Sequence, residues 1–427
     1  MALHGACLNN IYLSYLKEIS IFSQLWRLIV SICFGAARPR KATSGTGRKI
    51  ATRKRAQSCA GQHRGRIGKR RFEAEVKMTE ARLAVVAGGL GVIGHAVAEH
   101  LASRGGWEVV SVSRRKGQSA GKARHAQIDL LDAAATKAGL AKLGKPTHLF
   151  FAALMRADPQ EQVDLHVEML RNFVNGAAAA SSLRRVLLYE GAMYYGSYLG
   201  PFKTPAIESD PRVLPPNFYY SMEDWLFAES KGKTWDAVVI RPDLVCTSGF
   251  MDGHGFNIAL LIAVYATICK ELGIPLRYPG SAAAYRSLAQ VTDSAHLAHA
   301  SEWAATEAPA GETFNVANGD FFRWEQLWEM VARFFEMPLG NQQQISLTTL
   351  MKDKGPLWQS IVGKYGLAPH PYDALAYWPA GDFVLNCGYD VMTSTVKARK
   401  AGFHGVVDTW EMFERMFTGF RRQRLIP

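Results

Sequence analysis

Short apolar runs alternate along the chain with segments whose apolar residues recur every three or four positions. Residues 83–87 form such a run, and Ile93, Val97 and Leu101 follow at the spacing of one helix face. The same pattern predicts further strands at residues 107–113, 126–130, 147–152, 185–189 and 235–241. Because strands alternate with helices, the pattern predicts an α/β fold with a doubly wound parallel sheet.

Three glycines lie where the first predicted strand ends and the first predicted helix begins. Gly88, Gly91 and Gly94 stand three residues apart. Gly88 would allow a tight turn, Gly91 a close approach of backbone N–H groups to a pyrophosphate, and Gly94 close packing of the helix on the strand. The positive end of the helix dipole would face the phosphates. This order predicts a dinucleotide-binding site; a glycine-rich turn without a ligand is the alternative.

The second predicted strand ends at Ser113 and is followed by Arg114 and Arg115. An NAD enzyme usually has an acid near this position, which binds the ribose 2′-hydroxyl. Two guanidiniums suit a 2′-phosphate instead and predict NADPH, with an ordinary solvated basic pair as the alternative. Further cofactor contacts are expected at the start of the helix and at the ends of the third and fourth strands: Val92, Ile93, Asp129, Leu130 and Ala152.

Beyond about residue 245 the alternation becomes looser. A long apolar helix is predicted at residues 256–272, a strand at 314–318 and a helix at 324–335. Residues 347–379 are rich in Trp and Tyr, which are more often core residues than ligand contacts. This part therefore predicts a smaller C-terminal lobe.

The net charge of +13 lies entirely in residues 1–77, which contain sixteen Lys or Arg and three acids. The remainder is neutral, so nothing predicts nucleic-acid binding by the folded part. Residues 38–71 are expected to be disordered, and an arginine interrupts the apolar stretch at 19–36, so no membrane anchor is expected. The extension could be a transit peptide, a nucleic-acid-binding arm or sequence upstream of a true start at Met78, which is the favoured interpretation. The six cysteines show no metal-ligand spacing and no disulfide pattern, so no metal and a cytoplasmic location are expected.

Short-chain dehydrogenases carry Tyr-x-x-x-Lys after the fifth strand, and this chain departs from that motif. Tyr219 is followed four residues later by Glu223, and Tyr220 by Asp224. Residues 217–224, Asn-Phe-Tyr-Tyr-x-x-Glu-Asp, resemble instead the motif of the progesterone 5β-reductase/iridoid synthase-like (PRISE) enzymes. The segments 199–202, 265–270, 314–320 and 381–382 also fit that family, in order. The resemblance runs from about residue 83 to residue 427 and is greatest to bacterial and fungal members.

The resemblance implies an extended short-chain dehydrogenase/reductase: a Rossmann domain at 78–245, and residues 246–427 mainly as a substrate-capping lobe with some strands returning to the sheet. It implies NADPH-dependent reduction of an enone or enal, with hydride transferred to the β-carbon. Tyr219 would contact the cofactor and stabilise the enolate oxygen as an oxyanion-hole donor. The expected substrate is a small apolar carbonyl compound, and a homodimer is the expected assembly. Residues expected to line the substrate pocket are Met155, Tyr195, Phe202 and Tyr220.

One position departs from the family. Its lysine comes from a pattern like Gly-x-Lys-x-Tyr-Gly, and here the lysine position is Met193, which carries no charge and donates no hydrogen bond. Lys203, Tyr194 and Tyr195 are the candidates to replace it. Two alternatives therefore stay open: a catalytically weak NADPH-binding protein, favoured by Met193, and an epimerase or ketoreductase, disfavoured by Glu223.

Overall fold

The predicted strands form a seven-stranded sheet in the computed structural model, which describes residues 82–117, 121–178, 181–251 and 256–427. The strand order is β10-β6-β5-β4-β1-β2-β3, and every neighbouring pair is parallel. The strands are β1 (Arg82–Ala87), β2 (Trp107–Ser113), β3 (Arg124–Gln127), β4 (His148–Phe151), β5 (Arg185–Tyr189), β6 (Asp236–Pro242) and β10 (Thr313–Val316). The doubly wound parallel sheet predicted from the sequence is confirmed.

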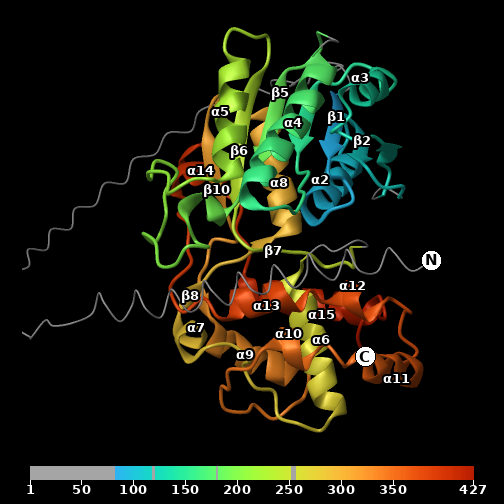
Figure 1. The fold of residues 1–427 in the computed structure, drawn as a ribbon, viewed down its shortest axis with the longest axis vertical. Coiled ribbons are helices and arrows are strands. Elements are labelled where there is room, and N and C mark those ends of the chain that lie inside the picture. The colour runs from blue at the N-terminus through green and yellow to red at the C-terminus, as the bar shows by residue number, and fades with distance from the viewer. Residues whose placement is uncertain (1–81, 118–120, 179–180, 252–255) are drawn as a thin grey trace, which may run out of the picture. The chain divides into compact units, whose positions relative to one another are not determined.

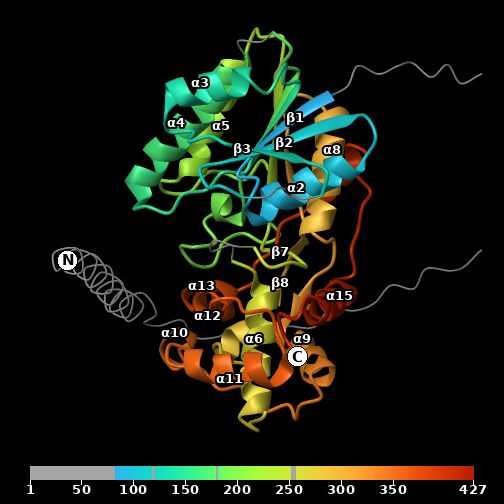
Figure 2. The same ribbon diagram turned by 90° about the vertical axis from the view of Figure 1, so that its right-hand side faces the viewer.

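Helices cover both faces of the sheet. They are α2 (Val92–Ser103), α3 (Ala133–Ala141), α4 (Pro159–Ala178), α5 (Phe218–Ser230) and α8 (Ser294–Thr306). Leu83 and Val85 of β1 share a core with α3, α4 and α5, whereas Ala84 and Val86 point to the other face and share a core with α2 and α8. Figure 2 shows the two helix layers on opposite sides of the strands. Burial on both faces explains why these strands are almost entirely apolar.

A second core is built by helices from the C-terminal part of the chain (Figure 1). They are α6 (Ile258–Glu271), α7 (Ala282–Arg286), α9 (Trp324–Phe334), α10 (Leu347–Leu350), α11 (Gly355–Tyr365), α12 (Tyr372–Leu375), α13 (Trp378–Leu385) and α15 (Thr409–Arg422). Helix α6 is buried from Ile258 to Cys269 because α11, α12, α13 and α15 pack around it. Of the aromatic residues predicted as core, Trp358, Tyr372 and Trp378 are buried here.

The chain passes between the sheet and this helical core more than once. After β6 it forms β7 (Val245–Cys246), which pairs with β9 (Thr292–Asp293), and then returns to the sheet as α8 and β10. The remaining elements are β8 (Leu288–Ala289), which pairs with β11 (Phe322–Arg323), the short helix η1 (Ala192–Tyr195) and α14 (Val396–Lys400), which packs on β10. The C-terminal half therefore supplies both the helical core and one edge of the sheet.

Some predicted boundaries differ from the observed ones. The third strand was predicted at 126–130 and is observed at Arg124–Gln127. The apolar pattern runs past the end of the strand because Ile128 and Leu130 are buried in the segment that follows it. The predictions made for residues 1–77 lie outside the described residues. Within the described ranges, no helix is long and apolar enough to cross a membrane, and no group of three or more His, Cys, Asp or Glu could hold a metal ion.

Candidate active site

The turn between β1 and α2 is shaped by its glycines. Gly88 has φ +74°, and a Cβ there would lie 2.5 Å from the carbonyl oxygen of Ala152 on the neighbouring strand's end. A Cβ on Gly94 would lie 2.4 Å from the carbonyl oxygen of Gly88, so only glycine lets α2 approach the turn this closely. Gly91 is the N-cap of α2, and no side chain among the described residues caps the helix there. Its free N–H groups suit an anionic ligand such as a pyrophosphate.

A cavity of about 620 Å³ opens over this turn, a volume typical of small-molecule sites. All of the cofactor residues predicted from the sequence line it, except Gly94, which packs beneath the turn, and Tyr219. The residues that line it are Gly88, Leu90, Gly91, Val92, Ile93, Val112, Ser113, Arg114, Arg115, Ile128, Asp129, Leu130, Ala152, Ala153, Leu154, Met155, Arg156, Met169, Leu244, Val245 and Phe256. The cavity therefore follows the carboxyl ends of the strands, where ligands bind in open α/β sheets.

Side chains of β3 hold the backbone of the arginine pair at the end of β2. Gln127 donates a hydrogen bond to the carbonyl oxygen of Arg114 at 3.0 Å. The ring nitrogen Nε2 of His125 lies 3.1 Å from the carbonyl oxygen of Arg115. The hydroxyl of Ser113 also donates to the carbonyl oxygen of Arg115, at 2.8 Å. The backbone of both arginines at the rim of the cavity is thereby held in place, while their side chains are exposed.

The segment after β4 lines the other end of the cavity and is held by a buried histidine. Nε2 of His166 in α4 accepts a hydrogen bond from the Met155 N–H at 3.0 Å, while Nδ1 lies 2.6 Å from the carbonyl oxygen of Gln162. Burial lowers the pKa of His166, so its neutral form is favoured. Arg156 lies over the ring of Tyr377 at 4.3 Å, which joins this segment to the helical core. Sequence reasoning did not single out His166 or Arg156.

Tyr219 lies near the start of α5, and Asn217 fixes it. The Asn217 side chain caps α5 by accepting a hydrogen bond from the Tyr219 N–H at 3.1 Å, and it donates to the carbonyl oxygen of Met193 at 3.1 Å. A methyl group on Gly191 would lie 3.4 Å from the Tyr219 hydroxyl, so this hydroxyl reaches the end of β5. The ring is partly buried, and among the described residues its hydroxyl has no hydrogen-bond partner. The described residues therefore leave its hydrogen-bonding capacity unused.

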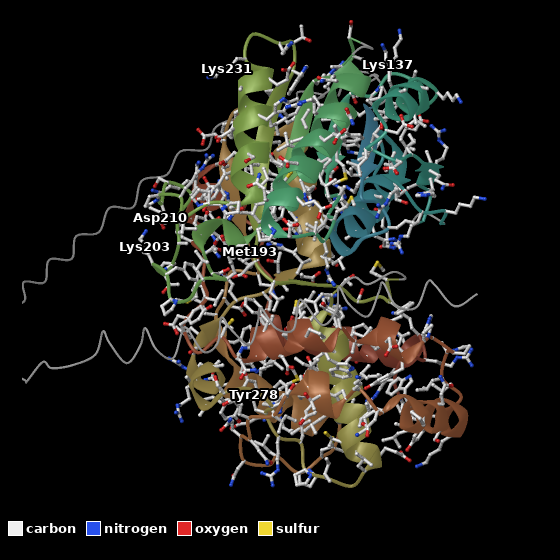
Figure 3. All side chains as sticks on the ribbon, viewed as in Figure 1. Lys137, Met193, Lys203, Asp210, Lys231 and Tyr278 are labelled. Atoms are coloured by element: carbon white, nitrogen blue, oxygen red, sulfur yellow. The ribbon has the colours of Figure 1, made fainter. Side chains whose placement is uncertain are left out.

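Within the part of the chain that the structure describes, the predicted candidate Lys203 does not take the place of the family's lysine at Met193. The Met193 side chain is 44% exposed in η1. Lys203 donates to Asp210 at 2.6 Å and is mostly exposed; Figure 3 shows this pair at the side of the molecule, apart from Met193. Lys203 is thus already paired with a carboxylate.

Of the residues predicted to line a substrate pocket, Met155 lies on the cavity. Tyr195, Phe202 and Tyr220 lie instead in an aromatic cluster beside Tyr219. The Tyr195 hydroxyl donates to Asn315 at 2.6 Å, and the Tyr220 hydroxyl donates to the carbonyl oxygen of Tyr194 at 2.6 Å. Phe202 packs against the same cluster. The hydroxyls of Tyr195 and Tyr220 therefore serve the protein's own hydrogen bonds.

Buried charges lie under this cluster, which the sequence did not indicate. Arg241 of β6 donates through Nε to Glu190 Oε2 and through Nη2 to Glu223 Oε1, both at 2.6 Å. Glu223 also accepts from Arg212 at 2.9 Å. The glutamate found where short-chain dehydrogenases carry lysine is thus an ion-pair partner in the core.

A family model for the PRISE-like Rossmann-fold domain matches residues 123–427, which is well over half of the chain. The chain belongs to this family. A model for the KR domain also matches residues 83–143, across the glycine turn. The family and the short-chain dehydrogenase/reductase class inferred from the sequence are thereby confirmed, and with them an oxidoreductase.

Relatives from plants and fungi match this PRISE-family chain at similar identity. The (S)-8-oxocitronellyl enol synthase of Nepeta cataria is 31% identical over 389 residues, covering 85% of this chain and 98% of the relative. The short chain dehydrogenase gsfE of Penicillium aethiopicum is 32% identical over 305 residues, covering 66% of this chain and 80% of the relative. Each similarity extends well beyond the glycine turn.

Solved structures share the fold at low identity. A short-chain dehydrogenase/reductase superfamily protein of Agrobacterium tumefaciens with bound NAD has a TM-score of 0.58 at 16% identity, covering 81% of this chain and 98% of that one. UDP-glucose 4-epimerase of Thermus thermophilus, in complex with NAD, has a TM-score of 0.55 at 18% identity and covers 79% and 99%. The extended short-chain dehydrogenase/reductase fold is confirmed.

Proposed function

We propose that this protein is an NADPH-dependent reductase of activated carbon–carbon double bonds, acting on small apolar enones or enals. The observation that carries the proposal is the Tyr219 hydroxyl, which forms no hydrogen bond with the described residues and which reaches the carboxyl end of the sheet. The enol synthases among the relatives support a reaction that passes through an enol or enolate.

NADPH, when bound, supplies the hydride that adds to the β-carbon. The uncapped start of α2 at Gly91 would hold the pyrophosphate, and Arg114 with Arg115 would pair with the 2′-phosphate. His166 would keep the segment at Met155 in position at the other end of the cavity through its hydrogen bond. The arginine pair supports preference for NADPH over NADH, because only NADPH carries the 2′-phosphate.

Tyr219 would donate a hydrogen bond to the carbonyl oxygen as negative charge develops on it. A hydroxyl that is already in position and unpartnered stabilises such a charge without reorganisation. Burial, and in second place the charge of Glu190, raise the pKa of Tyr219, so it would act as a neutral donor over the physiological range. Leu154, Leu244 and Phe256 on the cavity wall support an apolar substrate.

The second candidate function is an NADPH-binding protein with weak turnover. Met193 favours it, because no cation takes the place of the lysine in the described part of the site. The epimerase alternative is disfavoured, because Glu223 is committed to Arg241 and Arg212.

Incubation with a cyclic enone, an α,β-unsaturated aldehyde, a saturated ketone or UDP-glucose, with both NADPH oxidation and the products measured, separates these functions. The proposal expects turnover of the enone or enal and saturation of the double bond in the product. Reduction of the ketone alone, or epimerised sugar nucleotide, would refute it. NADPH binding without turnover of any compound would favour the second candidate function, an NADPH-binding protein.

A further inference from the structure

Glu190 follows β5 directly, and its side chain is fully buried. Its Oε2 accepts the hydrogen bond from Arg241 Nε at 2.6 Å, but its Oε1 has no hydrogen-bond partner among the described residues. Such a buried, unpartnered carboxylate oxygen is costly and demands an explanation. Its role is not accounted for by cofactor binding, since Glu190 does not line the cavity.

The charges around Glu190 do not balance. Arg241 is shared between Glu190 and Glu223, and Glu223 has a second guanidinium, that of Arg212, at 2.9 Å. Arg212 in turn also pairs with the exposed Asp224 at 2.7 Å. Glu190 therefore shares its one cation with Glu223, and ionisation of Glu190 would leave the cluster with more carboxylates than guanidiniums.

Tyr219 is the neighbour that would feel this charge. Its hydroxyl lies against Gly191, the residue after Glu190, and the Pro242 carbonyl oxygen, which follows Arg241, borders the same spot. The Glu190 carboxyl and the Tyr219 hydroxyl thus share one end of the sheet. The family resemblance implies a lysine cation in this region. This chain has Met193 at the lysine position, and the buried carboxyl group of Glu190 lies in the same region.

We propose that Glu190 is a positioning residue for Tyr219: its ionised carboxylate opposes both the loss of the tyrosine proton and the negative charge that develops on the substrate oxygen, whereas its neutral carboxyl opposes neither. The inference rests on the proposed function. It makes this protein a reductase whose rate is controlled by a buried carboxyl group in place of a cation.

The protonation state of Glu190 sets the expected pH dependence. Burial raises the pKa of Glu190 to about 8, with Arg241 opposing and Glu223 adding to the rise. Below that pH the carboxyl group is neutral and does not oppose enolate charge; above it, the carboxylate does. The rate of enone reduction should therefore fall as pH rises through about 8, on the order of tenfold, the effect of one pKa unit.

The test measures kcat for enone reduction from about pH 6 to about pH 10 in the full chain and in Glu190→Gln, Glu190→Asp and Glu302→Gln. Glu302 lies in α8, paired with His100, and serves as the control for loss of an acid. The fall near pH 8 should persist in Glu302→Gln, persist in Glu190→Asp with a shifted midpoint, and vanish in Glu190→Gln while NADPH affinity stays unchanged. A flat wild-type profile, or an unchanged fall in Glu190→Gln, overturns the inference; if Glu190→Gln does not fold, the wild-type and Glu190→Asp profiles decide.

A readout without turnover separates this inference from the proposed function. 4-Fluorophenylalanine at position 219, which carries no titrating hydroxyl, should show a change in fluorine chemical shift with a midpoint near pH 8 in the otherwise wild-type chain, and no such change in Glu190→Gln. If no enone is reduced, the proposed function fails, and this titration alone then decides whether Glu190 acts at position 219. A fluorine chemical shift that does not change near pH 8 would refute that action of Glu190.

Discussion

The adjacent Tyr219 and Tyr220 should respond in opposite ways to loss of the hydroxyl. Tyr219→Phe removes a group with no hydrogen bond among the described residues, so the free energy of unfolding should change by no more than about 0.5 kcal/mol. If that hydroxyl supports the enolate, kcat should fall by about 10² to 10³, the usual effect of losing one oxyanion-hole donor. The affinity for NADPH should stay near that of the wild type.

Tyr220→Phe is the matched control, with the same chemical change one residue away. The buried Tyr220 hydroxyl donates to the Tyr194 carbonyl oxygen at 2.6 Å and accepts from the Val213 N–H at 2.9 Å. Removing it leaves both groups without this partner and should lower the free energy of unfolding by about 1–3 kcal/mol. At temperatures where the variant is folded, kcat should stay within about threefold of the wild type, a barrier change of under 1 kcal/mol.

The assays are urea denaturation followed by fluorescence and steady-state NADPH oxidation with an enone that the wild type reduces. The reasoning fails if Tyr219→Phe reduces the enone at the wild-type rate, because the hydroxyl would then stabilise no charge. It also fails if both variants lose turnover equally, since the two hydroxyls would then share a role that their contacts exclude.

Four further changes test other parts of the site. Arg114→Ala should weaken NADPH binding about tenfold to a hundredfold in calorimetry and leave NADH nearly unchanged; equal losses would disprove the 2′-phosphate contact. Gly94→Ala places a methyl group 2.4 Å from a backbone oxygen and should destabilise the fold by about 1–3 kcal/mol in urea; an unchanged midpoint would contradict the close packing. Met193→Lys, at a side chain 44% exposed, should fit and raise enone turnover at least about tenfold; no gain would mean that a cation is not what limits the rate. Lys203→Met should match the exposed control Lys231→Met within about twofold in kcat, and a selective loss would make Lys203 the missing cation.

The sequence by itself determined the sheet and the cofactor turn. Apolar runs and helical spacing are local properties, and the order of strands and helices admits few topologies once crossovers are right-handed. The Gly88–Gly94 spacing is also a local feature, because it predicts a dinucleotide-binding turn from the strand before it and the helix after it alone. The family motif at 217–224 also marked Tyr219, although it could not show what the rest of the motif does.

Only the tertiary structure decided which polar groups meet. Glu190 and Arg241 are 51 positions apart and pair because β5 and β6 are neighbours in the sheet. The sequence predicted that Tyr220 lines the substrate pocket, yet the Tyr220 hydroxyl donates its hydrogen bond to the carbonyl oxygen of Tyr194. Hydrogen bonds and buried charges depend on distances of a few ångströms between remote segments, and no local pattern encodes these distances.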